Sequence, residues 1–419
     1  MKYFKKLSIT AFIAITAISF TSDSTNFISK NFKDADKHVH KMLEETAGIG
    51  NKFPRTINKK GQLTTTSMYD WTPGFFPGTL WYMYEFTKSE SYKKAALEWT
   101  EKLAPLKTFT QHHDLGFMMY CSYGNAYKNL GNPAYKDILI QSAKSLSTRF
   151  NTTTGTIKSW NQFVSWHGNK TYYFPVIIDN MMNLEMLYFA SKTSGDTSFS
   201  HIATTHAYNT MKNQIRKDYS HYHVVCYDST NGKVVGRETA QGYADNSTWA
   251  RGQAWGIYGF TMVYRETKNP EFLKTAKGMA DFFINNKRLP KDKIPYWDFN
   301  ANEAGYTPGV KSNANNISIK YRDASAAAIT ASALIELSTY VDKKTAKKYM
   351  TTAKKMLESL SSKAYKAPFG TNANFILMHS VGSIPHNNEI DVPLVYADYY
   401  YLEALLRYNQ LQKGLTLKF

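Results

Sequence analysis

The feature that most constrains the fold is a repeated pair of helices. In each repeat an apolar helix ends at a short polar break, and an amphipathic helix rich in Lys and Ala follows. Gly, Asn, Asp, Ser and Pro occupy the breaks, as expected where one helix stops and the next begins. The breaks lie near Ser89, at 131–133, at 195–196, at 269–270 and near Asp342. This pattern predicts a helical-hairpin repeat with insertions of variable length.

Twelve helices are predicted, at 29–46, 74–88, 90–103, 115–130, 133–148, 178–194, 197–216, 249–266, 269–286, 322–339, 343–359 and 391–411. Every second helix from 74–88 onward is apolar on nearly all sides, which is typical of a buried helix, whereas the others carry a polar face. Six buried and six amphipathic helices predict an inner and an outer ring, an all-α (α/α)6 toroid. An open solenoid is the alternative.

The N-terminus has the pattern of a secretory signal peptide. Lys2, Lys5 and Lys6 precede an apolar stretch at 7–20, and Ser/Thr-rich sequence follows. The stretch is too short to span a bilayer comfortably, and no cysteine follows it. We therefore expect a signal peptide at 1–22 and a single catalytic domain at 23–419, exported to the periplasm or secreted, without a membrane anchor. An apolar N-terminal helix of the folded domain is the alternative.

Composition favours a polyanionic partner. The formal net charge is +18 and aromatic residues make up 15% of the chain. The lysines are dispersed, with no dense Lys/Arg block, so an acidic polysaccharide is favoured over nucleic acid. Sugar-binding clefts use aromatic faces, although large cores do so as well. Cys121 and Cys226 both lie in apolar segments and are predicted to be buried free thiols.

Long connections precede the inner helices, at 105–114, 149–178, 217–248, 287–321 and 360–390. They are rich in Trp, His and Tyr. In a toroid they are expected to gather at one mouth, where a rigid scaffold commonly carries a binding site.

Polar residues open the inner helices at this mouth: Asp70 and Trp71, His112 to Asp114, Asp179, Trp249 and Arg251, Arg322 and Asp323, and Asp391. A single Asp at such a place is usually an N-cap. Several Asp on one rim suggest instead the paired carboxylates that glycosidic chemistry requires. Asp179 lies in the apolar segment FPVIIDNMMNLEML, where burial favours a protonated carboxyl, and is the predicted acid. Asp114 is the predicted second carboxyl.

Other chemistries have weaker support. The chain has no HExxH and no spaced Cys/His set, so no metal and no cofactor are predicted. His221 and His223 alternate in HYHVV and remain a minor alternative as a metal pair on a strand. A GxSxG turn and a Gly-rich phosphate loop are both missing from the sequence.

Six ordered segments resemble glycoside hydrolase family 88, the unsaturated glucuronyl hydrolases. They are DWTPGFFPGTLWYMYE (70–85), HDLGFMMYCSYGNAY (113–127), PVIIDNMMNLEMLYFAS (175–191), WARGQAWGIYGF (249–260), RDASAAAI (322–329) and EIDVPLVYADYYYLEALL (389–406). The resemblance implies an (α/α)6 barrel in which Asp114 and Asp179 are essential. The implied substrate-binding residues are Trp71, His113, Trp166, His223, Gln241, Trp249, Arg251, Trp255 and Ser380.

The resemblance also implies the reaction. Family members release a 4,5-unsaturated uronic acid from the non-reducing end of lyase-generated acidic oligosaccharides, which include sulfated ones. They hydrate the C4=C5 vinyl ether and use no cofactor. The alternatives are an unsaturated rhamnogalacturonyl hydrolase on the same barrel, a polysaccharide lyase and a non-catalytic glycan-binding protein.

Two side-chain roles stay open. Trp249 or Trp255 is predicted to stack on a sugar ring, with core packing as the alternative. Arg251 is predicted to bind the uronate carboxylate, since a guanidinium pairs with a carboxylate through two hydrogen bonds. A salt bridge to Asp245 or Glu238 is the alternative for Arg251.

Overall fold

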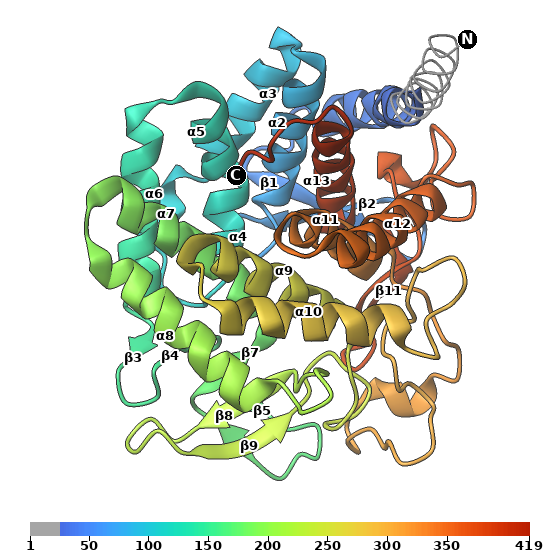
Figure 1. Cartoon of the computed structure of the whole chain (residues 1–419). Helices are drawn as coiled ribbons and strands as arrows, with labels where there is room; N and C mark the ends of the chain where they lie inside the picture. The colour runs from blue at the N-terminus through green and yellow to red at the C-terminus, as the bar shows by residue number, and fades with distance from the viewer. Residues whose placement is uncertain (1–25) are drawn as a thin grey trace, which may run out of the picture.

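Six helical segments lie side by side around a central axis and form the inner ring of the computed structural model, which describes residues 26–419 (Figure 1). Their bounds are α2 (Phe75–Thr87), α4 (Leu115–Met119) continued by η2 (Tyr120–Gly124) and α5 (Asn125–Leu130), η3 (Ile178–Asn183) continued by α7 (Leu184–Ser194), α9 (Ala250–Thr267), α11 (Ala324–Leu337) and α13 (Val395–Gln412). The predicted signal peptide at 1–22 lies outside the described residues.

The ring closes because the last inner helix packs against the first. The Phe75 ring of α2 lies 5.3 Å from the Tyr399 ring of α13, measured between centroids. The Tyr82 hydroxyl donates a hydrogen bond of 2.9 Å to that of Tyr399. Closure confirms the predicted (α/α)6 toroid over the open solenoid.

Outer helices pack against the inner ring. They are a helix described over 26–45, α3 (Glu90–Glu101), α6 (Pro133–Ser147), α8 (Thr197–Gln214), α10 (Pro270–Asn285) and α12 (Lys343–Leu360). Four of them begin where the breaks predict. Asn132, Asp196, Asn269 and Asp342 each accept a hydrogen bond from a backbone N–H of the first turn.

Three inner helices differ from their predicted form. The helix at 115–130 contains a π-helical turn, η2, and the helix at 178–194 begins with a 3-10 segment, η3. The predicted start of the last helix at 391 is wrong, since Asp391 lies in β11 (Asn388–Val392) and α13 begins at Val395. Pro393 explains the delay, because a residue that precedes proline is pushed towards extended backbone.

Short strands occupy several of the long connections. They are β1 (Lys52–Ile57), β2 (Leu63–Ser67), β3 (Phe150–Asn151), β4 (Thr156–Ile157), β5 (Phe163–Val164), β6 (Thr171–Tyr172), β7 (Pro175–Ile177), β8 (Val224–Tyr227), β9 (Val234–Glu238), β10 (Ser380–Ser383) and β11. All pair antiparallel, and β7–β8–β9 is the three-stranded sheet. Figure 1 shows β3, β4, β5, β8 and β9 along the lower edge of the toroid.

Cys121 and Cys226 are buried free thiols, as predicted. Within 26–419, none of the helices has the length and apolar character needed to cross a membrane.

Asp398 ties α13 to the segment that leads into β10. Its two carboxylate oxygens accept hydrogen bonds of 2.8 and 2.9 Å from the backbone N–H groups of Ile376 and Leu377. Burial raises the pKa of Asp398 to about 7, although both hydrogen bonds oppose the rise. The carboxyl therefore keeps its proton in the folded protein at a pH where the unfolded chain has lost it.

We predict that this group makes the folded state less stable as pH rises from about 4 to 7. Over that range the folded state binds more protons than the unfolded state, so the stability contributed by Asp398 is lost as pH approaches 7. Asp398→Asn cannot ionise. Urea unfolding of both proteins at pH 5 and pH 8 should show wild type losing more stability than the variant, by at most ~4 kcal/mol. Parallel pH profiles would contradict the prediction.

Candidate active site

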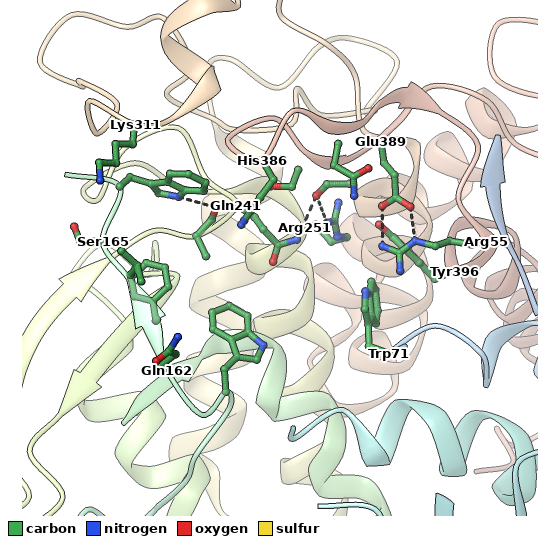
Figure 2. Close-up of a pocket in the computed structure, with 18 residues that line it drawn as sticks. Arg55, Trp71, Gln162, Ser165, Gln241, Arg251, Lys311, His386, Glu389 and Tyr396 are labelled. Carbon is green, nitrogen blue, oxygen red and sulfur yellow. Dashed lines mark hydrogen bonds and ion pairs between the residues drawn. The ribbon is translucent and has the colours of Figure 1, made fainter. Parts of the chain in front are cut away.

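A cavity of about 570 Å³ opens among the long connections (Figure 2). Four of the five predicted connections line it, together with β1 and the starts of α9 and α13. The lining residues are Arg55, Trp71, Trp160, Gln162, Phe163, Val164, Ser165, Trp166, Ala240, Gln241, Arg251, Lys311, Gly382, Ser383, His386, Asn388, Glu389 and Tyr396. The connection at 105–114 does not line the cavity but carries Asp114 beside it. The gathering of these loops at one mouth is as predicted.

Asp114 stands at the N-cap position of α4, yet its side chain makes no capping hydrogen bond. Two imidazoles hold it instead. His112 Nδ1 is 3.2 Å from one carboxylate oxygen, and His113 Nε2 is 3.3 Å from the other. His112 Nε2 donates to the Tyr69 carbonyl at 3.1 Å, which fixes the ring. The carboxylate is thus free of a structural capping role.

The pKa values of Asp114 and its two histidines shift in different directions. Burial favours a neutral carboxyl, but His113, His112 and Arg149 outweigh it and hold the pKa of Asp114 below its usual range. Burial also disfavours the charged form of His112. The hydrogen bond and the charge of Asp114 outweigh burial and raise the pKa of that imidazole. Burial dominates at His113 and lowers its pKa. Asp114 is therefore a carboxylate beside a neutral His113 at neutral pH.

Asp179 lies in the first turn of η3, buried at 8% exposure, and its Oδ2 has no hydrogen-bond partner. The imidazole of His223 faces it, with Nε2 3.6 Å from the Asp179 Oδ2. His223 Nδ1 accepts hydrogen bonds of 3.1 Å from the backbone N–H groups of Ala240 and Gln241. Because Nδ1 accepts these hydrogen bonds, Nε2 is the ring nitrogen that carries a proton, and it faces Asp179.

The two aspartates are brought together by the contact between α4 and η3. Gly116 lies against Asn183, with no space for a Cβ, and the Phe117 backbone N–H donates to Asn183 Oδ1 at 2.9 Å. His113 is near both carboxylates, since the charges of Asp114 and Asp179 both act to raise its pKa against the burial that lowers it. The predicted pair therefore forms one site.

This site adjoins the cavity through side chains that belong to both. Gln241 lines the cavity, and its backbone N–H is held by the His223 that faces Asp179. Trp71 also lines the cavity, and its ring lies 5.6 Å from that of Phe117, three residues after Asp114. A ligand in the cavity would present its inner end to the aspartates.

The structure places some of the predicted substrate-binding residues at the site and buries others in the core. Trp71, Trp166, Gln241 and Arg251 line the cavity, and His113 and His223 contact the aspartates. Trp249 and Trp255 do not line it. They are 1% and 0% exposed, and Trp255 packs on Phe117 and Tyr400. The structure supports core packing, the alternative to sugar stacking, for both rings.

Arg251 and Ser380 both make structural contacts, and their predicted roles in substrate binding stay predictions. Arg251 pairs with Asp323 at 3.1 Å rather than with Asp245 or Glu238, and it donates to the carbonyls of Val381 and Gly382. It therefore anchors β10 at the edge of the cavity. Ser380 is fully buried, and its hydroxyl accepts a hydrogen bond from the Ser325 N–H at the start of α11. In the same strand, Ser383 lines the cavity.

One part of the cavity lining was not predicted from the sequence. Arg55 of β1 binds both Glu389 of β11 and Asp70, so an ionic cluster joins two hairpins across the cavity wall. Arg55 and Glu389 stand 334 positions apart. Trp160 and Tyr396, which also line the cavity, lie in segments that the sequence singled out, but no motif marked them individually.

Within the described residues, His, Cys, Asp and Glu side chains form no group of three that could hold a metal ion. His221 does not form a metal pair with His223. Its Nδ1 is hydrogen-bonded to the Gln253 amide oxygen at 2.9 Å, and burial lowers its pKa to about 3.

A closed helical toroid with two buried aspartates beside an aromatic, basic cavity defines a class of enzyme that acts on carbohydrates. Comparison with known families assigns the chain more closely. Residues 46–419 match the family model of Glycosyl Hydrolase Family 88. The chain belongs to this family and is a glycoside hydrolase.

Similar proteins cover nearly the whole chain. An unsaturated glucuronyl hydrolase of Formosa agariphila is 45% identical over 386 residues, which is 92% of this chain and 91% of that protein. An unsaturated chondroitin disaccharide hydrolase of Streptococcus pyogenes is 35% identical over 363 residues, 85% of each chain.

Solved structures agree with the fold. The crystal structure of an unsaturated glucuronyl hydrolase specific for heparin has a TM-score of 0.84 and 45% identity, and the match covers 93% of this chain and 98% of that one. An aspartate-to-asparagine variant of the Streptococcus agalactiae enzyme, complexed with dGlcA-GalNAc6S, has a TM-score of 0.72, 28% identity and 91% coverage of both chains.

We predict that Gly116→Ala separates the two aspartates. The added methyl must push α4 away from Asn183, at a cost of ~1–3 kcal/mol in stability. A displacement of about 1 Å at reacting groups lowers turnover by ~10²-fold. Gly78→Ala is the matched control, because its Cβ would meet Tyr399 and the Cys121 carbonyl, away from the aspartates. Both variants should lose thermal stability, but only Gly116→Ala should lose turnover per folded molecule. Equal turnover in the two would contradict this role.

Proposed function

We propose that this enzyme releases a 4,5-unsaturated uronic acid from the non-reducing end of acidic oligosaccharides left by polysaccharide lyases. The observation that carries the proposal is the pairing of Asp114 and Asp179, each faced by an imidazole, beside an aromatic, basic cavity. The activities for which the similar proteins are named agree with it.

The proposed reaction hydrates the C4=C5 vinyl ether. Asp179 in its acid form gives a proton to C4, and the positive charge that develops at C5 is shared with the ring oxygen. Water then adds to C5 and returns its proton to the Asp179 carboxylate. The resulting hemiketal opens and releases the neighbouring sugar. The enzyme ends in its starting protonation state, so the reaction consumes only water.

The surroundings of the two aspartates suit different roles. Asp114 has a lowered pKa and stays ionised, so it suits binding of ring hydroxyls and stabilisation of positive charge. Asp179 has no basic side chain within hydrogen-bonding distance, and His223 at 3.6 Å is its nearest partner. Asp179 is therefore the proposed acid.

Export is part of the proposal. The basic leader at 1–22 has the pattern of a signal peptide, which would place the enzyme in the periplasm, or outside the cell if it is secreted. Large polysaccharides are first cut outside the cytoplasm, so an exported enzyme would meet lyase products there. Peptide sequencing of the mature N-terminus from the native host tests the cleavage.

We predict that Asp179→Asn lowers turnover by at least ~10²-fold, since protonation of carbon needs a positioned acid. Thermal stability should change little, because the buried Asp179 Oδ2 has no hydrogen-bond partner to lose. Asp196→Asn, the same chemical change at the cap of α8, should leave turnover unchanged. Near-normal turnover by folded Asp179→Asn would rule out Asp179 as the acid.

In heavy water the product should carry deuterium at C4, because the added proton comes from an exchangeable carboxyl. Mass spectrometry and NMR of the released uronate locate the label. A product without deuterium at C4 would exclude hydration of the double bond.

Ultraviolet absorbance of an unsaturated disaccharide separates the alternatives. The absorbance of the conjugated uronate should fall as the enzyme acts, since hydration removes the double bond. A lyase would raise absorbance on the intact polysaccharide, and a binding protein would leave it unchanged. A panel that includes unsaturated rhamnogalacturonyl disaccharide tests the closest alternative activity.

A further inference from the structure

Three polar atoms close to Asp114 are buried and unpaired. They are the two ring nitrogens of His113 and the amide oxygen of Asn180, and both side chains are 0% exposed. Within residues 26–419, none of the three atoms has a hydrogen-bond partner. Buried polar groups are nearly always paired, so these atoms are expected to serve one another or a ligand.

One short stretch of backbone places His113 and Asn180 side by side. The Ser159 carbonyl accepts a hydrogen bond of 3.1 Å from the His113 backbone N–H, and the Ile157 carbonyl accepts one of 2.7 Å from Asn180 Nδ2. A carbonyl can only accept, so the orientation of the Asn180 amide is fixed and its oxygen lies on the opposite side. The amide raises the pKa of His113, as an acceptor beside an imidazole N–H does.

We propose that Asn180 is a positioning residue that holds the proton of neutral His113 on Nδ1. The Asn180 Oδ1 accepts this N–H, and Nε2 becomes an acceptor for a hydroxyl group of the unsaturated uronate, next to Asp114. This inference rests on the proposed function, because it concerns the same substrate. It assigns a role to Asn180, which neither a motif nor the resemblance singled out.

The position of Asp114 decides which nitrogen is left for Asn180. His113 Nε2 lies 3.3 Å from Asp114 Oδ1 but makes no hydrogen bond to it. A neutral imidazole carries one proton, so an acceptor at Nδ1 leaves a lone pair on Nε2. Nε2 and the carboxylate oxygen then form two acceptors side by side. Two adjacent ring hydroxyls of a sugar present the matching pair of donors.

The proposed tautomer of His113 is the opposite of that of His223. His223 Nδ1 accepts hydrogen bonds from the backbone N–H groups of Ala240 and Gln241, so its proton is on Nε2, which faces Asp179. The site then has a ring donor on one side and a ring acceptor on the other. This arrangement suits a sugar, which offers both hydroxyl hydrogens and oxygen acceptors.

His206 of α8 adds no charge to this region. It is 0% exposed, its Nδ1 accepts a hydrogen bond of 3.0 Å from the Ile157 N–H, and burial lowers its pKa to about 3. Its Nε2–H is the other donor that Asn180 Oδ1 could receive. The titratable groups whose charges act on His113 are Asp114, Asp179 and His112.

NMR of protein labelled with ¹⁵N at histidine tests the proposal without a substrate. Two-bond ¹H–¹⁵N correlations distinguish a protonated ring nitrogen from a bare one, and the His113→Gln spectrum assigns the signals. At neutral pH, wild-type His113 should carry its proton on Nδ1, and Asn180→Ala should shift the proton towards Nε2. A proton on Nε2 in wild type, or an unchanged tautomer in Asn180→Ala, would overturn the proposal.

Kinetics separate this role from a structural one. Asn180→Ala should raise KM for an unsaturated disaccharide by up to ~10-fold, as expected for one lost hydrogen bond, with a smaller change in kcat. Asn125→Ala is the matched control, because Asn125 is buried in an inner helix and its Nδ2 also donates to a backbone carbonyl, that of Cys121, at 2.9 Å. Both variants should lose thermal stability. Equal KM values in the two, or a loss confined to kcat, would contradict the binding role.

Asn180→Asp is a second variant that keeps the shape and an acceptor oxygen but adds a negative charge. His113 should keep its proton on Nδ1, and its pKa should rise by ~1 unit or more. The acidic limb of kcat/KM should move to higher pH, because only the neutral ring offers Nε2 as an acceptor. Titration of the His113 signals separates this shift from one at Asp179.

An unchanged His113 pKa in Asn180→Asp would also overturn the proposal. A wild type that turns over no unsaturated disaccharide would instead refute the proposed function, because the NMR result does not depend on a substrate.

Discussion

The contact between α4 and η3 is the interaction on which the site depends. A glycine at position 116 allows the helix to approach the backbone at Asn183, and the Asn183 side chain closes the contact through a hydrogen bond to Phe117. Each aspartate lies a short distance along the chain from this junction. The toroid keeps the junction rigid, because every inner helix is held between two neighbours once α13 packs on α2.

Histidines then give the two aspartates different environments. His112 and His113 directly precede Asp114 in the same loop, and together with Arg149 they hold the pKa of Asp114 below its usual range. His223 approaches Asp179 from a distant loop, and backbone N–H groups fix which of its nitrogens carries the proton. Two carboxyl groups of the same type can therefore take different roles because different elements surround them.

The cavity wall is built from hairpins and loops that the helical ring brings to one end. Three cations of the cavity lining come from separate segments: Arg55, Arg251 and Lys311. They do not all have the same role. Arg55 and Arg251 hold parts of the wall together through carboxylates and carbonyls, whereas Lys311 stays available to a ligand. Of the three Lys and Arg side chains that line the cavity, two are therefore structural and one is exposed.

Local pattern determined the architecture and the two central residues. The alternation of apolar and amphipathic helices, with Asn and Asp caps at the breaks, was sufficient to predict the toroid, and Asp114 and Asp179 were identified by their places at helix starts and by resemblance.

Tertiary structure decided which side chains are buried and which distant charges pair, because local pattern does not determine either. Trp249 and Trp255 have the same sequence signal as a stacking residue, but neighbouring helices bury them. Arg55 and Glu389 meet across 334 positions, and only chain closure brings such charges together. The physical reason is range: helix periodicity and capping act within a few residues, whereas exposure and ion pairing depend on which distant segments the closed ring places side by side.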